Sequence, residues 1–193
     1  SASSSCYGNN FSIPTTENDK IEPLNPYALQ KYEGELYCRL FAEQFGLPSV
    51  SLRYFNVYGP RSFNEKDMFN AYSSVVEIFL NQRKNGRPLT ITGNGSQRRD
   101  FVHVYDVAKA NIAAIRARTG MFDFFNIASG KNNSVNEIAG LISKNIVHIP
   151  ARQGEAKLTL ADISKAKRLL KWKPLISLKE GVKITAEDLD KRQ

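Results

Sequence analysis

Segments that favour strands alternate with segments of helical periodicity along most of this chain. Residues 49–55, 89–92 and 122–127 are rich in β-branched and aromatic residues and are bounded by turn-forming residues, as strands are. The segments between them place apolar side chains three or four positions apart, which is the spacing of an amphipathic helix. This alternation favours an α/β architecture with a largely parallel sheet.

One helix has clear boundary signals in the sequence. Asn25 can cap it, Pro26 suits its first turn, and Gly46 marks its end. The helix carries a broad apolar face at i, i+4 spacing, made of Leu36, Tyr37, Leu40, Phe41 and Phe45.

Further helices are expected in the second half of the chain. Ser134 and Glu137 form a capping box that predicts a helix to about residue 144. Other helices are predicted over 72–85, with Val75, Val76, Phe79 and Leu80 as its buried side, and over 106–118, 163–170 and 178–189; a short strand is expected at 101–102.

The composition of the chain is that of an ordinary globular protein. Of its 193 residues, 41% are hydrophobic and 24% are charged, which argues against disorder or a fibrous repeat. No apolar run reaches the roughly 18 residues of a membrane-spanning helix, and the serine-rich start lacks the features of a secretory leader. We therefore expect no membrane insertion and a cytoplasmic location.

Cysteine and histidine are too few to support a metal site or a disulfide framework. The chain has two histidines and two cysteines, Cys6 and Cys38, with no spacing typical of metal ligands. We expect a reduced compartment and no bound metal.

The net charge is +8, from 27 Lys and Arg against 19 Asp and Glu. A basic protein can bind nucleic acid, an acidic membrane or a phosphorylated small molecule. No recognised nucleic-acid module is present in the sequence. A phosphate-rich small ligand and a solvated helix near the C-terminus explain the charge, so we expect no nucleic-acid partner.

Tyr27 and Lys31 are the sharpest candidates for chemistry. Their i, i+4 spacing puts both side chains on one face of the predicted helix. An ammonium group stabilises a nearby phenolate, so such a tyrosine could act as a general acid or base. The same spacing also arises by chance on many helices.

Four other motifs place polar groups where a ligand could bind. A serine cluster spans residues 3–5, and residues 53–61 begin at the C-terminal end of a predicted strand, where open α/β sheets bind ligands. Residues 98–104 and 152–155 contain arginines, whose planar fork suits a diphosphate. Each motif taken alone also fits an ordinary loop, strand end or surface salt bridge.

Taken in this order, the five motifs resemble the extended short-chain dehydrogenase/reductase family, and more narrowly its nucleotide-sugar 4-epimerases of the UDP-glucose or UDP-N-acetylglucosamine type. The resemblance runs from residue 1 to about residue 180. It implies the C-terminal part of a Rossmann-like doubly wound parallel sheet plus a small α/β substrate-binding domain. Residues 1–60 would be a remnant of the NAD-binding domain, and 61–193 mainly the nucleotide-sugar-binding domain, with 100–127 returning to the Rossmann sheet.

The resemblance implies roles for individual residues. Tyr27 would be the catalytic acid/base, and Lys31 would stabilise its phenolate and hold the nicotinamide ribose. Ser3 would be the catalytic hydroxyl that bridges the tyrosine and the sugar, and Tyr54 would line the nicotinamide pocket. The implied substrate-binding residues are Ser4, Ser5, Phe55, Asn56, Ile91, Arg99, Arg152, Glu155 and Thr159.

Four of these substrate-binding residues have more specific implied contacts. Arg99 and Arg152 would clamp the diphosphate, Glu155 would contact the uridine ribose, and Ile91 would flank the uracil. Thr159 is small at a position that shapes the sugar pocket in this family, which suggests that a 2-acetamido sugar is accepted.

The reaction implied by the resemblance is NAD-dependent epimerisation at C4 of a UDP-sugar, either UDP-GlcNAc/UDP-GalNAc or UDP-Glc/UDP-Gal. It would proceed through a 4-keto intermediate, with tyrosinate taking the proton of the 4-hydroxyl and NAD the hydride. The full-length protein would be a homodimer, because the tyrosine helix commonly packs across the dimer interface in this family.

The sequence departs from the family in one respect. Neither G-x-G-x-x-G nor G-x-x-G-x-x-G occurs among its 12 glycines. We therefore expect an N-terminally truncated chain that is inactive or very weak by itself.

Two alternatives stay open. A 4,6-dehydratase or decarboxylase of the same family is one, although the serine cluster at residues 3–5 lacks the carboxylates that such dehydratases usually carry there. The other is a non-catalytic fragment that binds nucleotide sugars or serves in assembly.

Overall fold

A computed structural model of the chain describes residues 1–9, 12–62, 74–151 and 158–192. The helices in these residues are α1 (Pro26–Phe45), α2 (Val75–Lys84), α3 (Val104–Arg116), α4 (Val135–Ile142) and α5 (Leu178–Lys191), with a 3₁₀ turn η1 (Ser4–Tyr7) and a π-helical turn η2 (Ala166–Leu170). The strands are β1 (Ala2–Ser3), β2 (Ser49–Tyr54), β3 (Val57–Tyr58), β4 (Leu89–Thr92), β5 (Arg98–Asp100), β6 (Val102–His103), β7 (Phe122–Ile127), β8 (Asn132–Ser134) and β9 (Ile146–Ile149).

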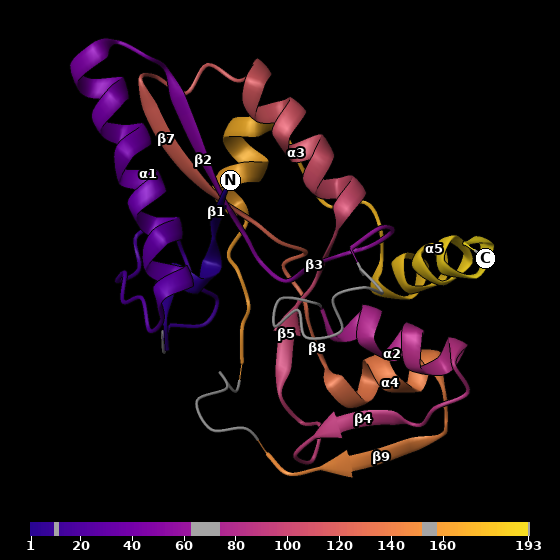
Figure 1. The fold of residues 1–193 in the computed structure, drawn as a ribbon. Helices are drawn as coiled ribbons and strands as arrows, with labels where there is room; N and C mark the ends of the chain where they lie inside the picture. Colours follow the sequence, from indigo (N-terminus) through magenta and orange to yellow (C-terminus); the bar gives the residue numbers. More distant parts are fainter. Residues whose placement is uncertain (10–11, 63–73, 152–157, 193) are drawn as a thin grey trace.

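A three-stranded parallel sheet in the order β1-β2-β7 organises one half of the molecule. β2 pairs with β7 along its whole length, whereas β1 pairs only with the last two residues of β2. The sheet lies between α1 on one face and α3 on the other, as Figure 1 shows. Both faces of the sheet are therefore covered by helices, as in other parallel sheets.

The alternation of side chains along β2 explains how the two faces are covered. Ser51 and Arg53 point to α1, where both bond to Glu35. Leu52 points the other way, into an apolar cluster with side chains of α3, β7 and η2. Thus α1 packs on the polar face of β2, and α3 packs on its apolar face.

The second half of the molecule is built around the parallel pair β4–β9. α2 and α4 pack together over β4, and α5 packs against α2 (Figure 1). The core here includes Tyr58, Val76, Phe79, Leu80, Leu89, Ile91, Phe101, Val135, Ile138, Ala139, Val182 and Ala186. Two small pairs, parallel β3–β6 and antiparallel β5–β8, lie outside both larger sheets.

The predicted α/β class with a parallel sheet is confirmed, and the local signals locate most elements. Asn25 caps α1 by accepting a hydrogen bond from the Ala28 amide at 2.9 Å, and Gly46 ends the helix in the left-handed conformation. Ser134 and Glu137 form the expected capping box at α4. α3 begins two residues before the predicted position, because His103 caps it by accepting from the Tyr105 amide.

The large side chains of the apolar face predicted for α1 are only partly buried within the chain. Its large side chains, among them Tyr37 at 64% and Phe45 at 70% exposure, stay accessible, while the buried residues of the helix are Ala28, Glu35 and Ala42. The short strands β1, β3, β5, β8 and β9 were not expected from the sequence, and all of them except β9 span only two or three residues.

We predict that Gly181→Ala destabilises the fold, although alanine is the better helix former. A Cβ at Gly181 in α5 would lie 2.1 Å from the hydroxyl oxygen of Tyr58. Gly140 in α4 has no atom within 4 Å of its own Cβ position and serves as the matched control. Urea unfolding should show a loss of about 1–3 kcal/mol for Gly181→Ala and a gain of up to about 1 kcal/mol for Gly140→Ala. A gain for both variants would contradict the packing of α5 on β3.

Candidate active site

The carboxyl ends of β1 and β2 meet beside the start of α1. Ser3 is the register partner of Tyr54, so the ends of the two strands lie level with each other. α1 packs against both β1 and η1. Open α/β sheets bind ligands at this edge, so the predicted catalytic residues lie on elements that border a ligand-binding edge.

The serine cluster forms a tight turn. Ser3 ends β1 and caps η1: its hydroxyl oxygen accepts hydrogen bonds from the Ser5 amide at 3.2 Å and the Ser5 hydroxyl at 2.9 Å. Gly8 follows with a φ of +61°, and a Cβ there would lie 2.1 Å from the Glu22 carbonyl oxygen. Only glycine fits this close approach, which fixes the direction in which the chain leaves the cluster.

Tyr27 and Lys31 lie on the first two turns of α1. The Lys31 ammonium nitrogen is 5.9 Å from the centre of the Tyr27 ring, and both residues are half-buried. This is within the range of a cation–π contact. A phenol that can give or take a proton thus lies beside an ammonium group on the same helix face.

Tyr54 and Phe55 follow each other but point to different surroundings. The Tyr54 hydroxyl donates to Asn111 Oδ1 of α3 at 2.9 Å, and its ring lines a groove of about 400 Å³ beside α3. Burial raises the pKa of Tyr54. Phe55 is buried and packs against Tyr7, with ring centres 6.3 Å apart. The Tyr54 hydroxyl is therefore not on the α1 side of the sheet.

Asn56 and Thr159 are brought together although they are far apart in the sequence. The Asn56 amide nitrogen donates to the Asp100 carbonyl at 2.8 Å and to the Thr159 hydroxyl at 3.4 Å. The Thr159 hydroxyl also accepts from the Asp100 amide at 3.1 Å. Two predicted substrate-binding residues thus share contacts with the backbone of one buried residue.

The side chain of Asp100 extends this cluster. Its carboxylate is fully buried and accepts from the amide and the hydroxyl of Ser129 at 2.8 and 2.6 Å, from the Gly130 amide at 3.0 Å and from the Ala161 amide at 3.2 Å. Burial raises the pKa of Asp100 to about 6, against the opposing effect of these donors. Asp100 therefore joins the end of β7 to the segment that carries Thr159.

Arg99 and Ile91 lie in contrasting positions. Arg99 is half-buried and donates to the Arg98 carbonyl at 3.0 Å. Ile91 is fully buried in the core that includes β4, so its side chain already packs against protein atoms. Ser4 and Ser5 lie in η1, whereas the predicted residues Arg152 and Glu155 lie outside the described residues.

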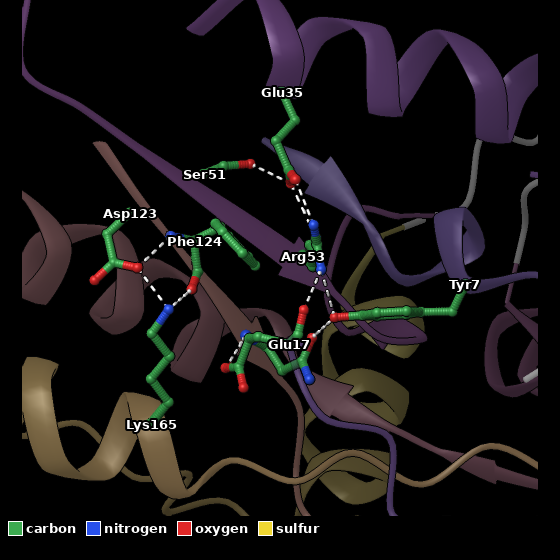
Figure 2. Close-up of polar contacts among 9 residues, drawn as sticks. Tyr7, Glu17, Glu35, Ser51, Arg53, Asp123, Phe124 and Lys165 are labelled. Carbon is green, nitrogen blue, oxygen red and sulfur yellow. Dashed lines mark hydrogen bonds and ion pairs between the residues drawn. The ribbon is translucent and has the colours of Figure 1, made fainter. Parts of the chain in front are cut away.

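The sequence reasoning gave no role to three residues at this edge. Asp100 lies within the motif at residues 98–104, but nothing in the sequence indicates that its carboxylate is buried. Arg53 and Glu35 form a buried ion pair between β2 and α1, drawn in Figure 2. No local signal marks this pair, because its two residues lie on different elements; the i, i+4 spacing of Lys31 and Glu35 would instead have suggested a pair between those two.

A parallel sheet covered by helices on both faces, with ligand-binding groups at the carboxyl ends of its strands, is typical of doubly wound α/β proteins. A model of the NAD dependent epimerase/dehydratase family matches residues 1–128 of this sequence. The chain belongs to this family.

Relatives and solved structures agree with this assignment. UDP-glucuronate 4-epimerase of Thermodesulfobacterium geofontis is 34% identical over 182 residues, which cover 90% of this chain and 53% of that protein. A structure of UDP-glucose 4-epimerase from Thermotoga maritima, with UDP-glucose, has a TM-score of 0.88 at 35% identity and covers 98% of this chain and 62% of that one. For UDP-N-acetylglucosamine 4-epimerase from Methanobrevibacter ruminantium the TM-score is 0.91 at 34% identity, with 100% of this chain and 62% of that one covered.

The relatives also include a different activity. UDP-N-acetyl-alpha-D-glucosaminuronate decarboxylase of Bacillus cytotoxicus is 33% identical over 173 residues, which cover 83% of this chain and 52% of that protein. The chain thus spans a little more than half the length of the curated relatives that it matches. Among the residues that the structure describes, no helix is both long and apolar enough to span a bilayer.

We predict that Asp100 makes stability depend on pH in the direction opposite to an ordinary paired carboxylate. Its pKa is raised from 3.8 to about 6 in the fold, so the native state binds the proton more tightly than the unfolded state. Stability from this group is therefore fully present below about pH 4 and is lost as the pH rises through about 6. Between about pH 7.5 and 5, wild type should gain about 1 kcal/mol over Asp100→Asn in urea unfolding. An unchanged difference between the two proteins would contradict the raised pKa.

Proposed function

We propose that this chain supplies the catalytic tyrosine and the nucleotide-sugar contacts of an enzyme that epimerises C4 of a UDP-sugar with NAD. The substrate pair is UDP-GlcNAc/UDP-GalNAc or UDP-Glc/UDP-Gal. The observation that carries the proposal is the Lys31 ammonium 5.9 Å from the Tyr27 ring, on a helix that packs against the strand ending in Ser3. Residues 1–60 and 100–127 are assigned to the cofactor side, and the rest of 61–193 to the nucleotide-sugar side.

The donor set at this edge fits a nicotinamide nucleotide. Lys31 and Tyr27 offer an ammonium and a phenol, which suit the hydroxyls of a nicotinamide ribose. Tyr54 would meet the cofactor through its ring or backbone, because its hydroxyl bonds to Asn111. When bound, NAD takes up and returns the hydride of sugar C4, so that the substrate passes through a 4-keto sugar.

The chain's own residues would move the proton and orient the sugar. Tyr27 as phenolate takes the proton of the 4-hydroxyl and later returns it. Lys31 favours that phenolate by its positive charge. The Ser3 hydroxyl bridges the phenol and the sugar oxygen by hydrogen bonds.

The remaining predicted residues would bind the rest of the substrate. Their assignment follows from the resemblance, and for Asn56 and Thr159 it is supported by their shared contacts with Asp100. The assigned residues are Ser4, Ser5, Phe55, Asn56, Ile91, Arg99, Arg152, Glu155 and Thr159. Of these, Ile91 would meet the uracil through its backbone, since its side chain is fully buried.

A decarboxylase is the second candidate, and the relative with that activity favours it. The serine cluster without a carboxylate favours the epimerase over a dehydratase.

We also propose that the exposed apolar face of α1 packs against a second copy of the protein, as the family resemblance implies. We expect the 193-residue chain by itself to turn over weakly or not at all, since it carries no glycine-rich fingerprint.

We predict that Tyr27→Phe lowers kcat of the full gene product at least about 100-fold, because the proton then has no acceptor. Tyr37→Phe, on the same helix and exposed, is the control and should keep wild-type turnover. The measurement is proton NMR of UDP-GlcNAc and UDP-glucose incubated with NAD. A dehydrated product in place of the 4-epimer, or release of CO2 from a UDP-uronate substrate assayed in parallel, would overturn the proposal.

We predict that Thr159→Tyr suppresses turnover of UDP-GlcNAc more than that of UDP-glucose, because the larger side chain fills the space for the acetamido group. Thr159→Val is the control: it removes the hydroxyl that accepts from Asp100 without adding bulk, and should affect both substrates by the same factor. The comparison is of kcat/KM for the two sugars. Equal losses of kcat/KM for the two sugars in Thr159→Tyr would contradict the inference that a small side chain at residue 159 makes room for the acetamido group.

A further inference from the structure

The helical stripe that carries Tyr27 and Lys31 continues to a buried carboxylate. Glu35 lies one turn beyond Lys31 and is 5% exposed. It is one of three buried residues in α1, and the other two are alanines. A buried carboxylate on a helix needs a partner of opposite charge. Which cation serves as that partner determines which other contacts the neighbouring cations make.

Arg53 of β2 is the partner of Glu35. Its Nε donates to Glu35 Oε2 at 3.0 Å, its Nη2 bonds to Glu35 Oε1, and Ser51 donates to Oε2 at 2.9 Å. Figure 2 shows the carboxylate reaching from α1 to the guanidinium, which it meets side-on through Nε and Nη2. This two-point geometry is the strong form of an arginine–carboxylate pair.

The Arg53 guanidinium is fixed from its other side as well. Nη1 donates to the Tyr7 hydroxyl at 2.8 Å and to the Glu17 carbonyl at 3.3 Å (Figure 2). The guanidinium carbon lies 4.4 Å from the centre of the Phe124 ring. Arg53 is 2% exposed, so its guanidinium cannot exchange these contacts for water in the folded protein.

Two other cations are within helical reach of Glu35. Lys31 precedes it by four residues and Arg39 follows it by four, and this spacing favours ion pairs on a helix. Neither is used for Glu35. Arg39 pairs with Glu43 at 3.4 Å, and the Lys31 ammonium lies over the Tyr27 ring.

We propose that Arg53 is a positioning residue for the reaction: by occupying the Glu35 carboxylate, it leaves the Lys31 ammonium with Tyr27. This inference rests on the proposed function. Without Arg53, Glu35 would be a buried carboxylate with only the Ser51 hydroxyl as a donor and no counter-ion, and Lys31 is a cation one helical turn away. Lys31 would turn toward Glu35 and leave the phenol.

The proposal predicts an asymmetry that a purely structural ion pair would not show. Arg53→Gln leaves the competing carboxylate in place, whereas Glu35→Gln removes it. In the full gene product, Arg53→Gln should lower kcat at neutral pH roughly tenfold. Glu35→Gln and the double variant Glu35→Gln/Arg53→Gln should keep the wild-type kcat.

A second readout does not depend on turnover. Nuclear Overhauser contacts between the Lys31 side-chain protons and the Tyr27 ring should be present in wild type, absent in Arg53→Gln and restored in the double variant. If Arg53→Gln does not fold, the double variant decides: the Lys31–Tyr27 contact supports the inference and its loss overturns it.

Equal losses in the two single variants, with no recovery in the double variant, would show that the pair acts only on structure. Failure of the proposed function is a separate result. In that case wild type itself would not epimerise UDP-sugars, while the nuclear Overhauser contacts would still decide the role of Arg53.

Discussion

A buried guanidinium joins the elements on which the candidate catalytic residues lie. Arg53 holds α1 through Glu35, the N-terminal segment through Tyr7 and Glu17, and β7 through the Phe124 ring. A buried charge that loses its partners costs several kcal/mol, so these segments must come together in one arrangement. A slip of one residue in β2 would turn Arg53 to the apolar face beside α3. The register that satisfies Arg53 also sets Ser3 level with Tyr54.

Asp100 has the complementary role on the other side of the ligand edge. Its carboxylate collects donors from Ser129, Gly130 and Ala161, while its backbone bonds to Asn56 and Thr159. One network is a cation surrounded by acceptors, and the other is an anion surrounded by donors. The predicted catalytic residues lie on elements held by the first network, and Asn56 and Thr159 are held by the second. Polar groups that must be satisfied once buried thus determine where the candidate site residues lie.

The sequence predicted what depends on local signals. The caps of α1 and α4 and the long strands β2 and β7 are encoded within a few residues of themselves, so they were located well. β9 was missed although residues 146–149 are rich in β-branched side chains and are bounded by a proline, the same signal that located its partner β4. The motifs identified the candidate residues but not their surroundings: Ile91 is buried in the core and the Tyr54 hydroxyl faces α3. The ion pair of Arg53 and Glu35 joins a strand to a helix, and only the fold brings the two together.

The full-length pairing of β2 with β7 has a consequence for the order in which the chain can assemble. Everything between residues 54 and 122, including α2, β4 and α3, is made after β2 and before its partner. At ordinary rates of synthesis β7 leaves the ribosome on the order of 3–14 seconds after β2. Throughout that interval one edge of β2 has no strand beside it, and unpaired edges are where chains associate wrongly. The topology that completes the sheet therefore also gives the nascent chain a period in which one edge of β2 is open to pairing with another chain.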